Sequence, residues 1–298
     1  MRVYSLSNDD NDFLGFEDDG TIIDLTRAIS FYEITVASCS NPPVRYIEEM
    51  ITENKLSVDF LGEVMSVLSK YGVKNDFAVK VDYEINEPLY PGKIIALGQN
   101  YLEHIKEMKG IVPDKPVLFG KWPSTVIGHL DSIIKPSWIG RMDYEAELAV
   151  IIGGTARNVN ASVAMNHVVG YTCLNDVSAR DMQKSDLSQS LPWMPSKNFD
   201  TFTPMGPCVL VAGAVKEPVS IQVQSAVNGE LKQNGNTSDF IFDIPTVIEY
   251  ITKIMTLDAG DVITTGTPVG VGPLEPGDVV DITCEDIGTL SNSVVLSE

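Results

Sequence analysis

The sequence lacks the features that would place it in several common functional classes. Its 298 residues include 21 basic and 41 acidic side chains, which gives a formal net charge of −20, and the basic residues form no long run. Because phosphate binding needs clustered Lys and Arg, no nucleic-acid partner is expected, and an anionic membrane surface is disfavoured for the same reason. The P-loop, G-x-G-x-x-G, G-x-S-x-G and H-E-x-x-H signatures are also absent.

Cysteines and long apolar runs are scarce as well. The four cysteines lie far apart without C-x-x-C spacing, which favours buried free thiols over disulfides or a thiolate zinc site. No stretch of 18 consecutive apolar residues occurs, and no apolar signal-peptide region follows Met1. We therefore expect a cytoplasmic protein that does not span a membrane.

The acidic charge is distributed unevenly along the chain. Residues 1–88 carry 17 acidic and 7 basic side chains, whereas the other 210 residues carry 24 and 14. Short β-like runs around an Asp-Asp-Gly turn predict a hairpin, and apolar spacing predicts a helix over Val58–Tyr71. These patterns predict a small α+β N-terminal domain over residues 1–88, followed after a Pro- and Gly-containing boundary by a β-rich body over residues 92–298.

The segment Asp143–Gly154 carries the most informative pattern. As one strand it would place Asp143, Glu145 and Glu147 on one face and aliphatic residues on the other. Three carboxylates on one face are unfavourable unless something neutralises them, and a hard divalent cation such as Mg²⁺ or Mn²⁺ would do so. A solvent-facing acidic edge explains this strand equally well. Asp176, where a buried strand is expected to give way to a helix, is either a further ligand or an N-cap.

A second group of residues suggests proton transfer and anion binding. In a helix over Tyr101–Lys109, His104 and Glu107 are i, i+3 neighbours, and the carboxylate would make the imidazole a general base. Taken alone, such a pair is more often a surface ion pair. Lys197 suits an anionic oxygen, although a lone lysine is usually solvated, and the Thr/Gly-rich turn at 264–272 offers hydroxyls and N–H groups or is simply a tight turn.

Taken together and in this order, these segments resemble the fumarylacetoacetate hydrolase family over about residues 92–298. The segments that carry the resemblance are Gly98-x-Asn100-Tyr101-x-x-His104-x-x-Glu107, Pro116-Val117-Leu118-Phe119-x-Lys121, Asp143-Tyr144-Glu145-x-Glu147-Leu148, Asn175-Asp176-x-Ser178-Ala179-Arg180-Asp181-x-Gln183, Ser196-Lys197-x-Phe199-Asp200, Val227-Asn228-Gly229-Glu230 and Gly266-Thr267-Pro268-x-Gly270-Val271-Gly272. One departure is that Trp122 follows Lys121, where family members more often place proline.

The resemblance implies a mainly β fold with α+β elements, a mixed β-sandwich roll that forms a homodimer. It implies one divalent cation per subunit, Mg²⁺ or Mn²⁺ with Ca²⁺ as a substitute. The implied metal ligands are Glu145, Glu147 and Asp176; the implied catalytic residues are His104 and Glu107, on a short lid helix, and Lys197; and the implied substrate contacts are Gln183, Thr267, Gly266 and Tyr144.

The function implied is metal-dependent hydrolysis of a carbon–carbon bond in a β-diketo acid. An acylpyruvate- or fumarylpyruvate-like substrate would yield pyruvate and a carboxylic acid, with His104 activating the attacking water. The alternatives are an oxaloacetate decarboxylase and a 2-hydroxyhepta-2,4-diene-1,7-dioate-type isomerase of the same family. A metal-binding scaffold without turnover is the alternative outside enzyme classes.

Overall fold

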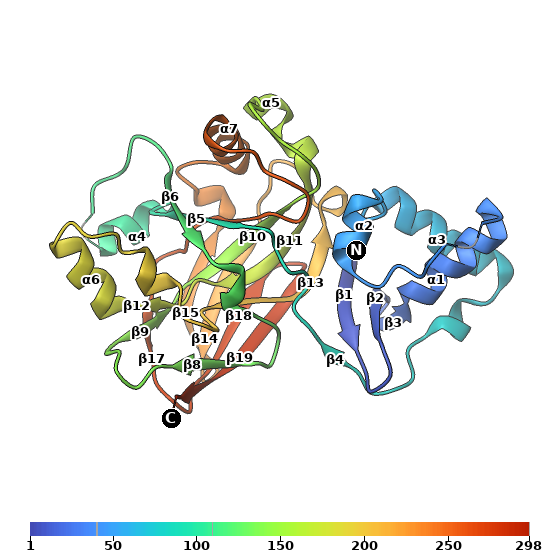
Figure 1. Cartoon of the computed structure of the whole chain (residues 1–298), viewed down its shortest axis with the longest axis horizontal. Helices are drawn as coiled ribbons and strands as arrows, with labels where there is room; N and C mark the ends of the chain where they lie inside the picture. Colours follow the sequence, from blue (N-terminus) through green and yellow to red (C-terminus); the bar gives the residue numbers. More distant parts are fainter. Residues whose placement is uncertain (40, 109, 298) are drawn as a thin grey trace.

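The structure is a computed structural model that describes residues 1–298 except 40, 109 and 298. Its largest sheet has 11 strands, of which nine follow the order β3-β2-β1-β13-β11-β10-β16-β5-β6, while β4 pairs with β1 and β7 pairs with β13. Most of these strands are labelled in Figure 1. The strands of this sheet are β1 (Arg2–Ser7), β2 (Asp12–Asp18), β3 (Thr21–Asp24), β4 (Glu84–Ile85), β5 (Ile94–Gly98), β6 (Val117–Lys121), β7 (Val126–Ile127), β10 (Ala146–Ile152), β11 (Val168–Asn175), β13 (Thr203–Val211) and β16 (Val262–Thr264).

Two smaller sheets complete the β-structure. The five-stranded sheet has the order β15-β14-β18-β19-β8, and a three-stranded sheet has the order β12-β9-β17. Their strands are β8 (Ser132–Lys135), β9 (Met142–Tyr144), β12 (Ser178–Ala179), β14 (Gln222–Val227), β15 (Glu230–Asn236), β17 (Gly272–Leu274), β18 (Val279–Cys284) and β19 (Gly288–Leu296). The mixture of parallel and antiparallel pairs, with two large sheets packed on each other, confirms the predicted mixed, mainly β fold.

Helices lie around the sheets, the N-terminal ones on the right of the view and the others at its top and left (Figure 1). The α-helices are α1 (Leu25–Tyr32), α2 (Ile47–Thr52), α3 (Val58–Tyr71), α4 (Leu102–Glu107), α5 (Ala161–Ala164), α6 (Arg180–Ser188) and α7 (Ile244–Ile254). Shorter helical turns are η1 (Glu33–Ala37), η2 (Lys74–Phe77), η3 (Pro123–Thr125), η4 (Met165–His167), η5 (Met194–Lys197), η6 (Ala212–Ala214) and η7 (Thr237–Asp239). No helix in the described part of the chain is both long and apolar enough to cross a membrane.

Strand β10 lies in the middle of the molecule and is buried on both faces. Leu148 and Val150 belong to the core between the two large sheets, whereas Ala149 and Ile151 belong to a second core under the N-terminal helices. Side chains of a strand alternate between faces, so this one strand contributes to both cores. Its end, where the carboxylates lie, is therefore held in a rigid environment.

Residues 1–88 extend the large sheet rather than standing apart from it. Strand β1 pairs antiparallel with β13 of the body, with Val3 opposite Val209. The predicted hairpin, formed by β2 and β3, and the predicted helix over Val58–Tyr71 are both present, and Ser57 caps that helix by accepting a hydrogen bond from the Phe60 N–H at 3.2 Å. This N-terminal part covers one face of the sheet, and no predicted metal or catalytic residue lies in it.

Two predicted elements differ from the observed ones. The single strand predicted over Asp143–Gly154 is broken at Glu145, because the Glu145 N–H donates to the side-chain oxygen of Asn175 at 2.9 Å instead of to a strand partner. The lid helix spans Leu102–Glu107, and Lys109, the predicted end, lies outside the described residues.

Candidate metal and catalytic site

The three predicted metal ligands meet at one end of the β10–β11 pair. Glu145 precedes β10, Glu147 belongs to it and Asp176 follows β11. The strands run antiparallel with Ala146 opposite Asn175, and the Asp176 N–H donates to the Glu145 carbonyl at 2.9 Å. One oxygen from each carboxylate lies within 4.8 Å of the others, and all three side chains are buried. The cluster is therefore not a solvent-facing acidic edge.

Lys197 lies between two of these carboxylates. Its Nζ donates to Glu145 Oε2 at 2.7 Å and to Asp176 Oδ2 at 2.6 Å. Burial alone would raise the pKa of Glu145, but the charges of Lys197 and Arg180 outweigh burial and lower it. Burial would likewise lower the pKa of Lys197, yet the carboxylates of Asp176 and Glu145 raise it. The lysine is thus a buried, charged member of the site rather than a solvated side chain.

Arg180 is a second buried cation to which the sequence analysis gave no role. Its Nη2 pairs with Glu145 Oε1, its Nε donates to Asp143 Oδ2 at 2.8 Å and its Nη1 donates to Gln183 Oε1 at 2.5 Å. Asp143 is also held by Arg141, whose Nε lies 2.6 Å from Oδ1. The structure therefore separates Asp143 from the two glutamates with which strand periodicity grouped it.

Lys121 is a third buried cation that was missed. Its Nζ donates to the Lys197 carbonyl at 2.6 Å and lies 2.7 Å from Asp176 Oδ1. Burial lowers the pKa of Lys121, and the nearby Asp176 charge opposes that shift. The one sequence signal for Lys121 and Arg180 was their place in segments that carry the family resemblance.

Glu147 is the carboxylate of the cluster left without a cation. Within the described residues it forms no ion pair; its Oε2 accepts the Gly266 N–H at 2.8 Å. Burial raises its pKa well above the ordinary value, and the Asp176 and Glu145 charges raise it further. Asp176 Oδ1 is also buried and receives no hydrogen bond of ordinary geometry, although the Lys121 ammonium lies nearby. A divalent cation would supply the missing positive charge, and an all-oxygen donor set suits Mg²⁺ or Mn²⁺.

His104 and Glu107 form the predicted pair on helix α4. His104 Nδ1 lies 3.2 Å from Glu107 Oε2, and His104 is buried. Since a carboxylate only accepts hydrogen bonds, this contact places the hydrogen of a neutral imidazole on Nδ1 and leaves Nε2 free to accept a proton. The burial of His104 sets the pair apart from an ordinary surface ion pair.

One cavity is lined by both His104 and the acidic cluster. Its volume is about 160 Å³. The side chains and backbone that line it come from Leu97, Gly98, Gln99, His104, Met108, Val117, Phe119, Glu145, Glu147, Asp176, Arg180, Gln183, Leu187, Trp193, Lys197 and Thr267. The three carboxylates, Arg180, Lys197 and the imidazole thus share a small pocket that also has an apolar wall.

Two of the four predicted substrate contacts line the cavity and two do not. Gln183 and Thr267 line the cavity. Gly266 lies behind it, with a φ of +87° that favours glycine, so that its N–H reaches Glu147. Tyr144 does not line the cavity; its hydroxyl donates to the Gly270 carbonyl at 2.9 Å, which gives it a place under the 266–272 loop.

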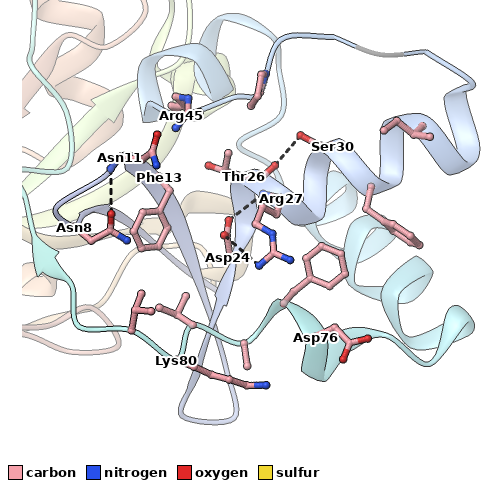
Figure 2. A pocket seen from close by; sticks show the side chains of 17 residues that line it. Asn8, Asn11, Phe13, Asp24, Thr26, Arg27, Ser30, Arg45, Asp76 and Lys80 are labelled. Carbon is pink, nitrogen blue, oxygen red and sulfur yellow. Dashed lines mark hydrogen bonds and ion pairs between the residues drawn. The ribbon is translucent and has the colours of Figure 1, made fainter.

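A larger hollow of about 700 Å³ lies in the N-terminal part of the chain (Figure 2). Its lining includes charged side chains together with apolar and amide ones; the charged residues are Asp24, Arg27, Arg45, Asp76 and Lys80, all labelled in Figure 2. Acidic and basic groups are mixed there, and none of the predicted catalytic or metal-binding residues is present. Size alone therefore does not identify the candidate site.

Comparison with known proteins decides the family. Residues 93–295 match the family model described as fumarylacetoacetate (FAA) hydrolase, C-terminal. The chain belongs to the fumarylacetoacetate hydrolase family. Oxaloacetate tautomerase YisK of Bacillus subtilis strain 168 is 42% identical over 246 residues, covering 79% of this chain and 77% of that protein. The mitochondrial oxaloacetate tautomerase fahd2 of Xenopus laevis is 41% identical over 212 residues, covering 69% of this chain and 66% of that protein.

A solved structure of the fumarylacetoacetate hydrolase family agrees with the architecture along the whole chain. Maleylpyruvate hydrolase from Sphingobium sp. SYK-6, solved with manganese(II) ion and pyruvate, is 30% identical, has a TM-score of 0.76 and covers 100% of both chains. The family contains hydrolases, tautomerases and isomerases. This protein is accordingly an enzyme-family member with a buried acidic cluster able to hold a divalent cation.

Proposed function

We propose that this protein is a divalent-cation-dependent enzyme that interconverts the keto and enol forms of a short 2-oxo dicarboxylic acid such as oxaloacetate. The observation that carries the proposal is that His104, which Glu107 contacts at Nδ1, and the acidic cluster line one small cavity. Two relatives more than 40% identical bear the name oxaloacetate tautomerase, which favours this reaction over the others known for the family.

Glu145, Glu147 and Asp176 would hold one Mg²⁺ or Mn²⁺ ion. When bound, the ion would polarise the oxygens of a chelating 2-oxo acid and favour negative charge on them. The ammonium group of Lys197, held charged by two carboxylates, contributes further stabilisation of an anionic oxygen. Thr267 and Gln183 provide polar contacts along the cavity wall.

His104 is the group placed to exchange the proton on carbon. Tautomerisation moves one proton between the enol oxygen and C3, the carbon next to the oxo group. In the keto-to-enol direction Nε2 of His104 takes the C3 proton and passes it to the oxygen on C2. In the reverse direction it takes the enol O–H proton and returns a proton to C3, while Glu107 keeps the other ring nitrogen protonated.

Hydrolysis of an acylpyruvate is the second candidate function. The same Nε2 can take a proton from a water molecule, which would then attack the distal carbonyl of the substrate. The observation in favour is the 30% identity and full-length similarity to maleylpyruvate hydrolase, a protein whose structure was solved with pyruvate.

One set of assays separates the candidate reactions. Oxaloacetate and acetylpyruvate are each incubated in D₂O with Mg²⁺, Mn²⁺ or EDTA and followed by NMR. A tautomerase exchanges C3 hydrogen of oxaloacetate for deuterium without consuming it, a decarboxylase converts it to pyruvate and CO₂, and a hydrolase converts acetylpyruvate to pyruvate and acetate. Metal binding without any of these changes, over a broad panel of 2-oxo acids, would overturn the enzymatic proposal in favour of a scaffold.

A further inference from the structure

Gln233 connects the strand that carries the metal ligands to the loop that carries Thr267. It lies on β15 and is fully buried. Its Oε1 accepts the Ala146 N–H at 3.0 Å, and its Nε2 donates to the Pro268 carbonyl and to Thr267 Oγ1, both at 2.8 Å. Both N–H donors of this amide group and one lone pair of its oxygen are therefore used within the protein.

The partners fix which end of the amide is oxygen and which is nitrogen. The backbone N–H of Ala146 only donates and the Pro268 carbonyl only accepts, so a flipped amide would lose both contacts. Nε2 consequently donates to Thr267, and the hydroxyl hydrogen of Thr267 must point toward some other acceptor. Among the described residues the hydroxyl donates no hydrogen bond, and Thr267 lines the cavity.

We propose that Gln233 is a positioning residue that makes the Thr267 hydroxyl a hydrogen-bond donor into the cavity, where it selects a carboxylate or carbonyl oxygen of the substrate. The inference rests on the proposed function to the extent that the ligand is a 2-oxo acid. Because Ala146 lies between Glu145 and Glu147 in the chain, the same amide also fixes this donor relative to the carboxylates that would hold the cation.

The decisive variant is Gln233→Glu, which keeps an acceptor for the Ala146 N–H but removes both donors. The Thr267 hydroxyl would then donate to the new carboxylate and present only lone pairs to the cavity. The probe is oxalate, an unreactive dicarboxylate, whose affinity for Mn²⁺-loaded protein is measured by calorimetry. A lost hydrogen bond to a charged group predicts an affinity roughly 10- to 100-fold weaker.

Gln233→Met gives a second measurement that separates positioning from simple support of the fold. In this variant the hydroxyl is free to rotate and can still donate to oxalate, so the affinity loss should be smaller than for Gln233→Glu. A purely structural role for the buried amide predicts the same loss for both variants. Gln222→Glu and Gln222→Met, at an exposed position on β14, serve as matched controls with unchanged affinity.

Coupling to Thr267 completes the test. Thr267→Val should weaken oxalate binding by a similar factor, and Gln233→Glu should add almost nothing in the Thr267→Val background. Wild-type oxalate affinity in Gln233→Glu, or a full additional loss in the double variant, would overturn the inference. If Gln233→Glu fails to fold, the same cycle with Gln233→Met decides. Since oxalate binding needs no turnover, inactivity toward every 2-oxo acid would overturn the proposed function alone.

Discussion

Glu107 and Gly270 are joined by a hydrogen bond that ties helix α4 to the 266–272 loop. The Gly270 N–H lies 3.2 Å from Glu107 Oε1, while the other oxygen of this carboxylate faces His104. Gly270 has a φ of +104°, and a Cβ atom there would lie 2.3 Å from the Lys232 carbonyl, so the loop can approach this closely only with glycine. The loop also accepts a hydrogen bond from the Tyr144 hydroxyl at the Gly270 carbonyl. A chain of hydrogen bonds thus runs from Tyr144 to the proposed base.

Tyr144→Phe should lower kcat about tenfold with little change in KM or Mn²⁺ affinity. Burial raises the pKa of Tyr144 to about 12, so its hydroxyl remains a donor to Gly270 at neutral pH. Losing that contact loosens the support of Glu107, and misplacement of a catalytic group by about 1 Å can cost 10²-fold. Steady-state kinetics of C3 hydrogen exchange measures the effect.

Tyr4→Phe is the matched control for Tyr144→Phe. Tyr4 is also buried and donates its hydroxyl hydrogen to Glu17 at 2.7 Å, but it lies in the N-terminal part of the chain. Both variants should lose about 1 kcal/mol of unfolding free energy, whereas only Tyr144→Phe should lose kcat. Equal kcat values in the two variants would show that Tyr144 has no part in positioning the base.

His104→Ala should reduce turnover by about 10²–10⁴ while leaving metal binding intact. The imidazole contacts Glu107 and forms no hydrogen bond to the three carboxylates within the described residues, so its removal takes away the base without changing the ligand set. Turnover and Mn²⁺ affinity are measured on the same preparation. His167→Ala, outside the cavity, should behave as wild type, and wild-type turnover in His104→Ala would exclude the proposed role.

Glu147→Gln should abolish tight Mn²⁺ binding without lowering the stability of the metal-free protein. Burial beside two other carboxylates raises the pKa of Glu147 and favours its neutral form, and it has no cationic partner in the described chain, so a neutral amide of similar size should cost little in the metal-free protein. Mn²⁺ at about 100 times its Kd should raise the unfolding free energy of the wild type by roughly 2.7 kcal/mol and leave the variant unaffected.

Differential scanning calorimetry with Mn²⁺ or with EDTA measures this difference. Glu249→Gln is the control, because Glu249 is paired with Lys253 on helix α7 and should not alter the response to metal. A metal-free Glu147→Gln protein that melts well below wild type would show that Glu147 is stabilised by contacts other than a cation.

Local patterns in the sequence predicted the His104–Glu107 pair better than the acidic cluster. The i, i+3 spacing of His104 and Glu107 predicted their contact, because a helical turn alone brings those side chains together. Glu145 and Glu147 were found from a period-two pattern, yet the same pattern wrongly grouped Asp143 with them. Besides the nearby Arg141, Asp143 pairs with Arg180, 37 residues away, and that contact depends on how strands β9 and β12 pair.

Contacts over long sequence separations explain what was missed. Lys121 reaches the Lys197 carbonyl across 76 residues, and Gln233 reaches Ala146 across 87. Their partners are set by the register of the sheets and by the course of loops, neither of which is encoded in a local run of residues. Lys121 and Gln233 are buried because distant parts of the chain pack around them, and local sequence patterns do not predict that packing.

His129 should make the protein less stable as the pH falls from about 7.5 to about 5.5. Its Nδ1 accepts the Ser291 N–H at 3.1 Å, so the folded state needs the neutral ring with its hydrogen on Nε2. Burial lowers the pKa of His129 below its ordinary value of 6.5, and the weaker influence of Asp281 only partly opposes this. A base with a lowered pKa in the folded state contributes stability above its unfolded pKa and loses it as the pH falls below that value.

The contribution of His129 is isolated by comparison with His129→Gln. Groups other than His129 are present in both proteins, so their effect cancels in the difference between the two stability curves. Urea unfolding at several pH values should show a flatter dependence for His129→Gln than for wild type, while His167→Gln should follow wild type. Parallel curves for His129→Gln and wild type would mean that loss of the Ser291 contact on protonation costs the folded state nothing, and would overturn this role of His129.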